Sequence, residues 1–74
     1  VTGAAISPNE QTVVLLSEGA LHIFSDFSSP GKFYEGKYRK QVLKGTGQTE
    51  GVACESNDVL VITSEGGNLY RYTL

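Results

Sequence analysis

An internal repeat with a spacing of 48 residues organises this chain. The apolar run at residues 13–16 (VVLL) aligns with the run at residues 59–62 (VLVI), and a Ser-Glu-Gly tripeptide lies after each run. Repeats of about 20 to 50 residues indicate stacked supersecondary units that bury a continuous core only against their neighbours. The other matches are Gly3 with Gly51, Ala5 with Ala53, Ile6 with Cys54, Asn9 with Asn57, Leu21 with Leu69 and Phe24 with Tyr72.

The regular elements are predicted to be β-strands. β-Branched and aromatic residues lie between Gly, Asn, Ser and Pro turn signals, and no window has the apolar spacing of a helix. The segment DFSSPGKFYEG is predicted to be a loop, because its Pro-Gly pair and its second glycine oppose regular strand pairing. The expected strands are 3–7, 12–17, 20–25, 37–45, 50–56, 58–64 and 68–74.

This strand order predicts an all-β fold of antiparallel meander sheets of the propeller-blade type, with about seven strands in two repeats. We interpret residues 1–74 as a single all-β unit. It comprises an incomplete three-stranded repeat (1–26), a loop (27–36) and a four-stranded repeat (37–74). Because both runs are apolar at successive positions, each sheet needs cover on both faces. Two blades cannot close a ring, so we expect a piece of a larger propeller or a unit that associates with itself.

The composition excludes several supports that small chains commonly use. Cys54 is the only cysteine among 74 residues, which excludes an internal disulfide, and the lack of a CxxC pair or a His/Cys cluster argues against structural zinc. No apolar run approaches the ~20 residues of a membrane span, so no transmembrane segment is expected. A net charge of −2 gives no reason to expect nucleic acid as a partner. The remaining support is contact with more protein.

Five of the six basic residues lie in residues 32–44, KFYEGKYRKQVLK. A basic cluster with interleaved aromatic residues is suited to an anionic surface. The interpretation that we favour is an outer or edge strand whose lysines protect it against aggregation.

The second copy, TEGVACESNDVLVITSEGGNLYRY, resembles a recurrent blade of secreted bacterial propeller proteins. The shared features are Glu-Gly, a short strand, a turn, an apolar strand ending in Ser-Glu, and a Leu-Tyr pair followed by another aromatic residue. The similarity is to phytase-like and lactonase-like propellers. The first copy, GAAISPNEQTVVLLSEGALHIF, resembles the looser blades of Bacteroidetes-type propellers. The Trp-Asp dipeptide of WD repeats is absent, since the chain has no Trp.

In the phytase-like enzymes, glutamates of the Glu-Gly and Ser-Glu type line the central channel and bind calcium. The resemblance therefore implies that Glu50 and Glu65 are metal ligands and that calcium is the cofactor; outside this reading no cofactor is expected. In the first copy Glu50 falls opposite Thr2, and only Glu18 corresponds to Glu65. Calcium needs six to eight oxygen ligands, so one or two carboxylates are too few without further blades.

The other residues with reactive side chains fit structural roles. Cys54 aligns with Ile6, so we expect a small, buried and inaccessible apolar residue. His22, the only histidine, is expected to be a half-exposed residue on one face of a strand. Ser17 and Ser64 have no histidine at a matching repeat position, which argues against a Ser-His-Asp triad.

The aromatic residues of the loop, Phe27, Phe33 and Tyr34, are the candidate binding surface, because loops on a rigid scaffold carry function. The alternative is that they fold back and seal the core. We predict a non-catalytic propeller-type binding or scaffolding fragment with a protein or glycan partner, located outside the cytoplasm (periplasmic, cell-surface or secreted). The alternative function is part of a calcium-dependent phytase-like or lactonase-like hydrolase, which acidic residues at matching positions of further blades would favour.

Overall fold

Seven strands and one short helix form the protein in a computed structural model that describes residues 2–17, 19–44 and 48–74. Glu18 and the glycines at positions 45 and 47 lie outside the described residues. The elements are β1 (Gly3–Ile6), β2 (Thr12–Ser17), β3 (Ala20–Ser25), η1 (Pro30–Glu35), β4 (Lys37–Val42), β5 (Thr49–Cys54), β6 (Val59–Ser64) and β7 (Leu69–Thr73).

Within each sheet, the strands pair antiparallel with their neighbours along the chain, which confirms the prediction of an all-β fold with seven strands. The first sheet has the strand order β1-β2-β3-β4 and the second sheet has the order β5-β6-β7. In the segment predicted to be a loop, η1 is a kinked 3₁₀-helix that Pro30 begins and that Lys32 interrupts with non-helical backbone angles.

Strand β4 completes the first sheet, so the expectation that it begins a four-stranded second repeat is wrong. It pairs with β3 over its whole length, and Tyr38 lies opposite Phe24 with ring centroids 5.1 Å apart. Such cross-strand aromatic pairs stabilise a hairpin. A polar edge strand gives no sequence signal for which neighbour it joins. By pairing, the first repeat has four strands and the second has three. The prediction that β4 is an exposed edge strand is confirmed.

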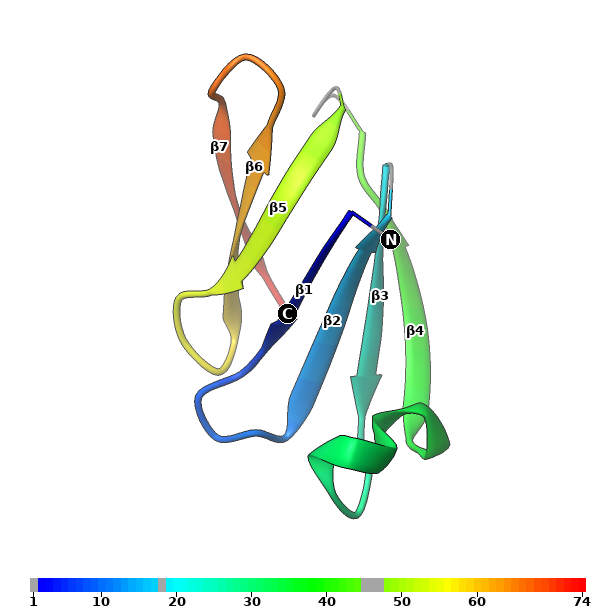
Figure 1. Ribbon diagram of the computed structural model, residues 1–74. Coiled ribbons are helices and arrows are strands. Elements are labelled where there is room, and N and C mark those ends of the chain that lie inside the picture. The colour runs from blue at the N-terminus through cyan, green and yellow to red at the C-terminus, as the bar shows by residue number, and fades with distance from the viewer. Residues whose placement is uncertain (1, 18, 45–47) are drawn as a thin grey trace.

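The two sheets pack face to face as a wedge (Figure 1). Strand β1 lies against β5, whereas β4 and β7 are the far edges of their sheets (Figure 1). Strands β1 and β5 approach each other closely at Gly3, where an added Cβ would lie 3.3 Å from the backbone nitrogen of Val52. A glycine in a strand interior often marks such a close backbone approach.

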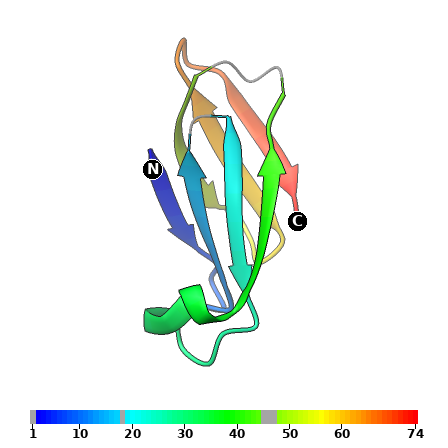
Figure 2. The same ribbon diagram turned by 90° about the vertical axis from the view of Figure 1, so that its right-hand side faces the viewer.

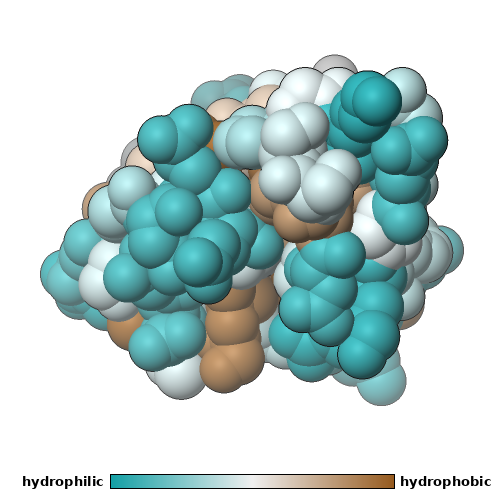
Figure 3. All heavy atoms as spheres, turned by 90° about the horizontal axis from the view of Figure 1, so that it is seen from below, coloured by the Kyte–Doolittle hydropathy of each residue, from teal (hydrophilic) through white to brown (hydrophobic). Residues whose placement is uncertain are grey.

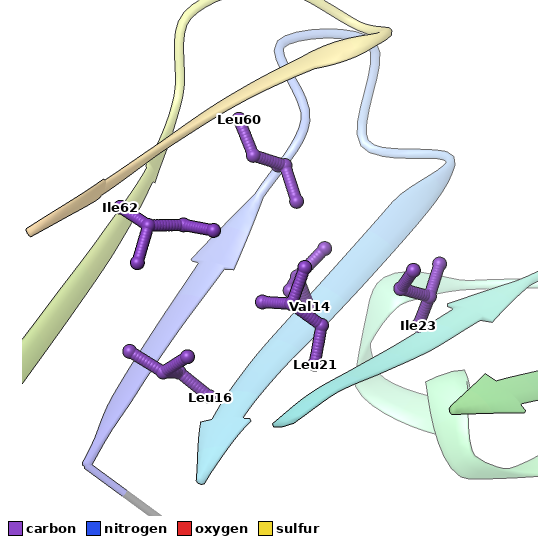
Figure 4. Packing of buried hydrophobic residues seen from close by; sticks show 6 residues of the cluster. All are labelled: Val14, Leu16, Leu21, Ile23, Leu60 and Ile62. Atoms are coloured by element: carbon purple, nitrogen blue, oxygen red, sulfur yellow. The ribbon is translucent and has the colours of Figure 1, made fainter. Parts of the chain in front are cut away.

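The core lies between the sheets and consists of aliphatic side chains (Figure 4). The first sheet contributes four of them and the second sheet two, and all are at most 5% exposed. Burial of one such side chain stabilises the fold by roughly 1.5–3 kcal/mol. The core residues are Val14, Leu16, Leu21, Ile23, Leu60 and Ile62.

The strand registers correct the alignment of the two repeats. Gly3 pairs with Leu16, and its counterpart Gly51 pairs with Thr63. Leu16 therefore corresponds to Thr63 rather than to Ile62, and the whole of β6 moves by one position relative to β2. Two runs of four apolar residues match equally well at either offset, so the sequence alone did not decide between them. A shift of one residue exchanges the two faces of a strand.

With this correction, Leu60 and Ile62 correspond to Val13 and Leu15. Leu60 and Ile62 point toward the first sheet, whereas Val13 and Leu15 point away from the second sheet. Equivalent faces of the two sheets therefore point in the same direction. The two repeats are arranged head to tail rather than as mirror-like halves of a sandwich.

Candidate binding surface

The first sheet has one side that the second sheet does not cover, which we call the open face. It is the side turned away from the second sheet, and in the described part of the molecule η1 is the element that lies over it (Figure 2). Strand alternation and register place on it Ala4, Ile6, Val13, Leu15, Ser17, Ala20, His22, Phe24, Tyr38, Lys40 and Val42.

The half of the open face formed by β1 and β2 is apolar. A shallow hollow of about 350 Å³ lies there, between the two strands and η1. Among the residues that line it, Val13 is buried and Ile6 is 43% exposed. Exposed apolar surfaces are common at protein–protein interfaces, so this hollow is a candidate contact site. The hollow is lined by Ala4, Ala5, Ile6, Val13, Leu15, Pro30 and Phe33.

The structure brings Phe33 and Tyr34 of the predicted surface into an aromatic cluster on the open face. Phe33 packs edge-on against Phe24 at 5.1 Å, and Tyr34 packs edge-on against Phe33 at 5.9 Å. These are the geometries that aromatic pairs prefer. Tyr34 and Tyr38 are 65% and 54% exposed, so the cluster is anchored at Phe24 and presents two phenol rings to solvent.

A hydrogen-bonded chain of three side chains crosses the same face. The ring nitrogen Nε2 of His22 lies 2.8 Å from the Ser17 hydroxyl, and Nδ1 lies 2.7 Å from the Tyr38 hydroxyl. No histidine lies at a matching repeat position, but His22 reaches Ser17 from the neighbouring strand, a contact that comparison of the repeats does not reveal. The prediction that His22 is half-exposed is confirmed. A phenol occupies the place where a Ser-His-Asp triad has its carboxylate, and a neutral phenol stabilises a charged imidazolium less well.

The third residue of the predicted surface, Phe27, lies elsewhere. It lines a polar hollow at the lower end of the wedge together with Asn57 and Asp58. An adjoining hollow of about 430 Å³ includes Lys37 and Arg39. This end is mostly hydrophilic, with hydrophobic atoms visible between two hydrophilic areas (Figure 3). The loop aromatics are therefore divided between two sites, and Phe33 and Tyr34 alone belong to the open face.

Cys54 packs against the core, as the apolar position predicts, but it is half-buried rather than inaccessible. Burial raises the pKa of the Cys54 thiol. A raised thiol pKa lowers the fraction of thiolate, the form that reacts. This environment is typical of a structural cysteine.

The two glutamates implied by the calcium reading lie at the same end of the second sheet. Glu50 is in β5, and Glu65 is in the turn after β6, where its N–H donates to the carbonyl of Gln48 at 2.8 Å. Both are exposed. Among the described residues, no three His, Cys, Asp or Glu side chains are close enough to hold a metal ion. Gly66 has a positive φ of 93°, so the turn itself requires the glycine of the Ser-Glu-Gly tripeptide.

Sequence reasoning missed the contributions of Phe24, His22 and Tyr38 to this surface. The period-2 alternation of β3 already placed His22 and Phe24 on one side, but the partner strand that adds Tyr38 was assigned to the other repeat. The alternation within β3 was therefore interpreted correctly, and the error lay in the strand with which β3 was expected to pair.

Among the described residues, no helix has the length and apolar character that crossing a membrane requires. A scan against family models, a search of curated proteins and a search of solved structures each gave no significant match.

Proposed function

We propose that this chain is a non-catalytic binding or scaffolding unit of the propeller-blade type that contacts a protein partner through its open face. The location that goes with this proposal is outside the cytoplasm, on the strength of the resemblance to secreted bacterial blades.

The observation that carries the proposal is the difference between two equivalent faces. Leu60 and Ile62 are covered by the first sheet, whereas the corresponding Val13 and Leu15 belong to a face that η1 covers only at one end. This face is suited to contact with another protein surface, because within this chain a packed sheet covers the equivalent face of the second sheet. A glycan is the alternative partner, for which the exposed rings of Tyr34 and Tyr38 supply a stacking platform.

The chemistry of the polar groups supports binding over hydrolysis. Both ring nitrogens of His22 are engaged by hydroxyl groups, and Glu50 and Glu65 lie on the other sheet. The alternative function, part of a calcium-dependent phytase-like or lactonase-like hydrolase, would need these glutamates to share a metal with further oxygen ligands.

The test is binding of anilinonaphthalene sulfonate, a dye that fluoresces on apolar protein surfaces, at protein concentrations too low for self-association. The native chain should bind the dye in a saturable way, and Ile6→Lys should reduce the signal severalfold because it charges the apolar hollow. Asn68→Lys, in the exposed turn between β6 and β7, is the matched control and should leave the signal unchanged.

Three other outcomes would count against the proposal. A native chain that binds no dye lacks an accessible apolar face. Saturable binding of oligosaccharides that is lost in Tyr34→Ala would establish the glycan alternative. Hydrolysis of aryl phosphates or lactones that depends on calcium and on Glu65 would establish the enzyme.

A further inference from the structure

The equivalence of the two sheets indicates which kind of surface fits the open face. Resting on the proposed function, we propose that the occupant is a second copy of this chain, docked head to tail through the outward side of its second sheet. The outward side is the side of β5, β6 and β7 that faces away from the first sheet. Register and alternation place on it Gly51, Ala53, Val59, Val61, Thr63, Leu69, Arg71 and Thr73.

The argument starts from the contact that already exists. Inside the chain, the face with Leu60 and Ile62 is covered by the face with Val14, Leu16, Leu21 and Ile23. The open face of the first sheet is equivalent to the second-sheet face that carries Leu60 and Ile62. The outward side of the second sheet is equivalent to the first-sheet face that carries Val14, Leu16, Leu21 and Ile23. Each copy therefore carries the two complementary halves of the same contact on opposite sides, with η1 over one end of the open face.

The side chains of the outward side keep part of the apolar character that this contact needs. Val61 and Leu69 stand where the first sheet has Val14 and Leu21. Leu69 is 56% exposed, so it offers apolar surface on the outward side. Thr63 stands in place of Leu16, and Arg71, which is paired with Glu55 at 2.8 Å, stands in place of Ile23. The apolar patch is narrower than inside the chain, so the association is weaker than the intramolecular packing.

A backbone feature supports the same placement. Gly3 is a strand glycine that lets the backbone of Val52 approach, and its counterpart Gly51 is on the outward side. An added Cβ at Gly51 would meet only the hydroxyl of Thr63, at 3.0 Å, so nothing among the described residues uses the space above it. In a head-to-tail pair, Ala4 of the second copy, the counterpart of Val52, would occupy that space.

A contact between two different faces is heterologous. Repeated heterologous contacts produce a closed ring if the rotation between copies closes and an open chain of molecules if it does not. A contact between two open faces would instead stop at a dimer. The two arrangements are therefore distinguished by which variants block assembly.

The experiment is light scattering across a concentration series for the 74-residue chain and three variants. Ile6→Lys charges the open face, Leu69→Lys charges the outward side, and Asn68→Lys is the control next to Leu69. The native chain and the control should increase in mass beyond a dimer as concentration rises. Each of the other two should show an apparent dissociation constant at least about tenfold higher. Circular dichroism checks that all four proteins are folded.

An equimolar mixture of Ile6→Lys and Leu69→Lys is the decisive sample, because each variant keeps the half that the other has lost. The mixture should form a one-to-one complex and stop there. If Leu69→Lys associates as well as the native chain, the contact is between two open faces and the proposal is wrong. If the native chain stays monomeric at all concentrations, the proposal is also wrong, and the dye measurement then shows independently whether the open face is a binding surface.

Discussion

The side-chain oxygen Oδ1 of Asn57 accepts a 2.9 Å hydrogen bond from the backbone N–H of Asn9, its counterpart in the first repeat. The bond joins the turn between β1 and β2 to the turn between β5 and β6. Asn9 uses its own side-chain oxygen inside its turn, where it accepts from the N–H of Gln11 at 3.0 Å. Equivalent asparagines therefore have different roles, one within a repeat and one between repeats.

Loss of this bond should weaken the packing of the two sheets. We expect Asn57→Ala to lower the free energy of unfolding by about 0.5–1.5 kcal/mol, the net value of a typical hydrogen bond. Asn57→Asp keeps an acceptor oxygen at the same place and should recover most of the loss. Urea unfolding curves measure both, and equal losses in the two variants would show that the acceptor is not what matters.

Neighbouring positions of β6 should respond differently to truncation, because their side chains point to opposite sides of the sheet. Leu60→Ala removes a fully buried side chain and should cost about 2–5 kcal/mol. Val61→Ala, on the outward side, should cost about 1 kcal/mol or less. Thermal and urea unfolding provide the comparison. A larger loss for Val61→Ala would mean that the register of β6 is one residue from that described.

The glycine that follows η1 has a steric role. A Cβ at Gly36 would overlap the backbone oxygen of Ser25 and press on Phe27. Gly36→Ala should therefore displace the connection between β3 and β4 and cost about 1–3 kcal/mol or more. Gly31→Ala is the control, since an added Cβ there meets nothing within 4 Å. Similar unfolding curves for the two variants would contradict the tight approach at Gly36.

The thiol of Cys54 should react slowly but measurably. Near neutral pH, a bulky aromatic disulfide should label the folded chain more slowly than the unfolded chain, because the side chain is half-buried and burial raises its pKa. The raised pKa contributes stability that is fully present below the ordinary thiol pKa and is lost as pH rises through the folded-state value. Labelling as fast in the folded as in the unfolded chain would contradict this environment.

Calcium should leave the stability unchanged. Glu50 and Glu65 are exposed, and a ligand that binds only the folded state at a hundredfold excess over its dissociation constant would add about 2.7 kcal/mol. A thermal melt with and without millimolar calcium makes the measurement. A rise of several degrees that disappears in Glu65→Gln would favour the hydrolase.

The sequence predicted the strands well and their partners less well. The apolar runs, the turn glycines and the alternation in ALHIFS are local signals, so the positions of β2, β3 and β6 could be read directly. The pairing of β4 depends on contacts across an eleven-residue connection, residues 26–36, and its polar sequence fits either neighbour. The side to which Leu60 points depends on a one-residue register that four consecutive apolar residues do not specify.

The residues of the candidate surface could also be predicted only in part. Phe33 and Tyr34 were identified because aromatic residues in a loop are conspicuous, and Phe27 was included for the same reason although it faces the polar hollow. The bond between Ser17 and His22 depends on the β2–β3 hairpin, which brings residues five positions apart side by side. Repeat comparison could not find this pair, because it exists in one copy only.

The common direction of the two sheets has an evolutionary consequence. When every unit presents one kind of face forward and its complement backward, duplication of the coding segment for one unit creates no new type of contact. Each added unit reuses residue preferences that selection has already tested, and stability grows nearly in proportion to the number of units. Only the two end faces lack cover, so selection on solubility would act there and leave the interior contacts free to diverge slowly. Thr63 and Arg71, on the outward side of the second sheet, stand where the first sheet has Leu16 and Ile23, so the two copies of this face have already diverged.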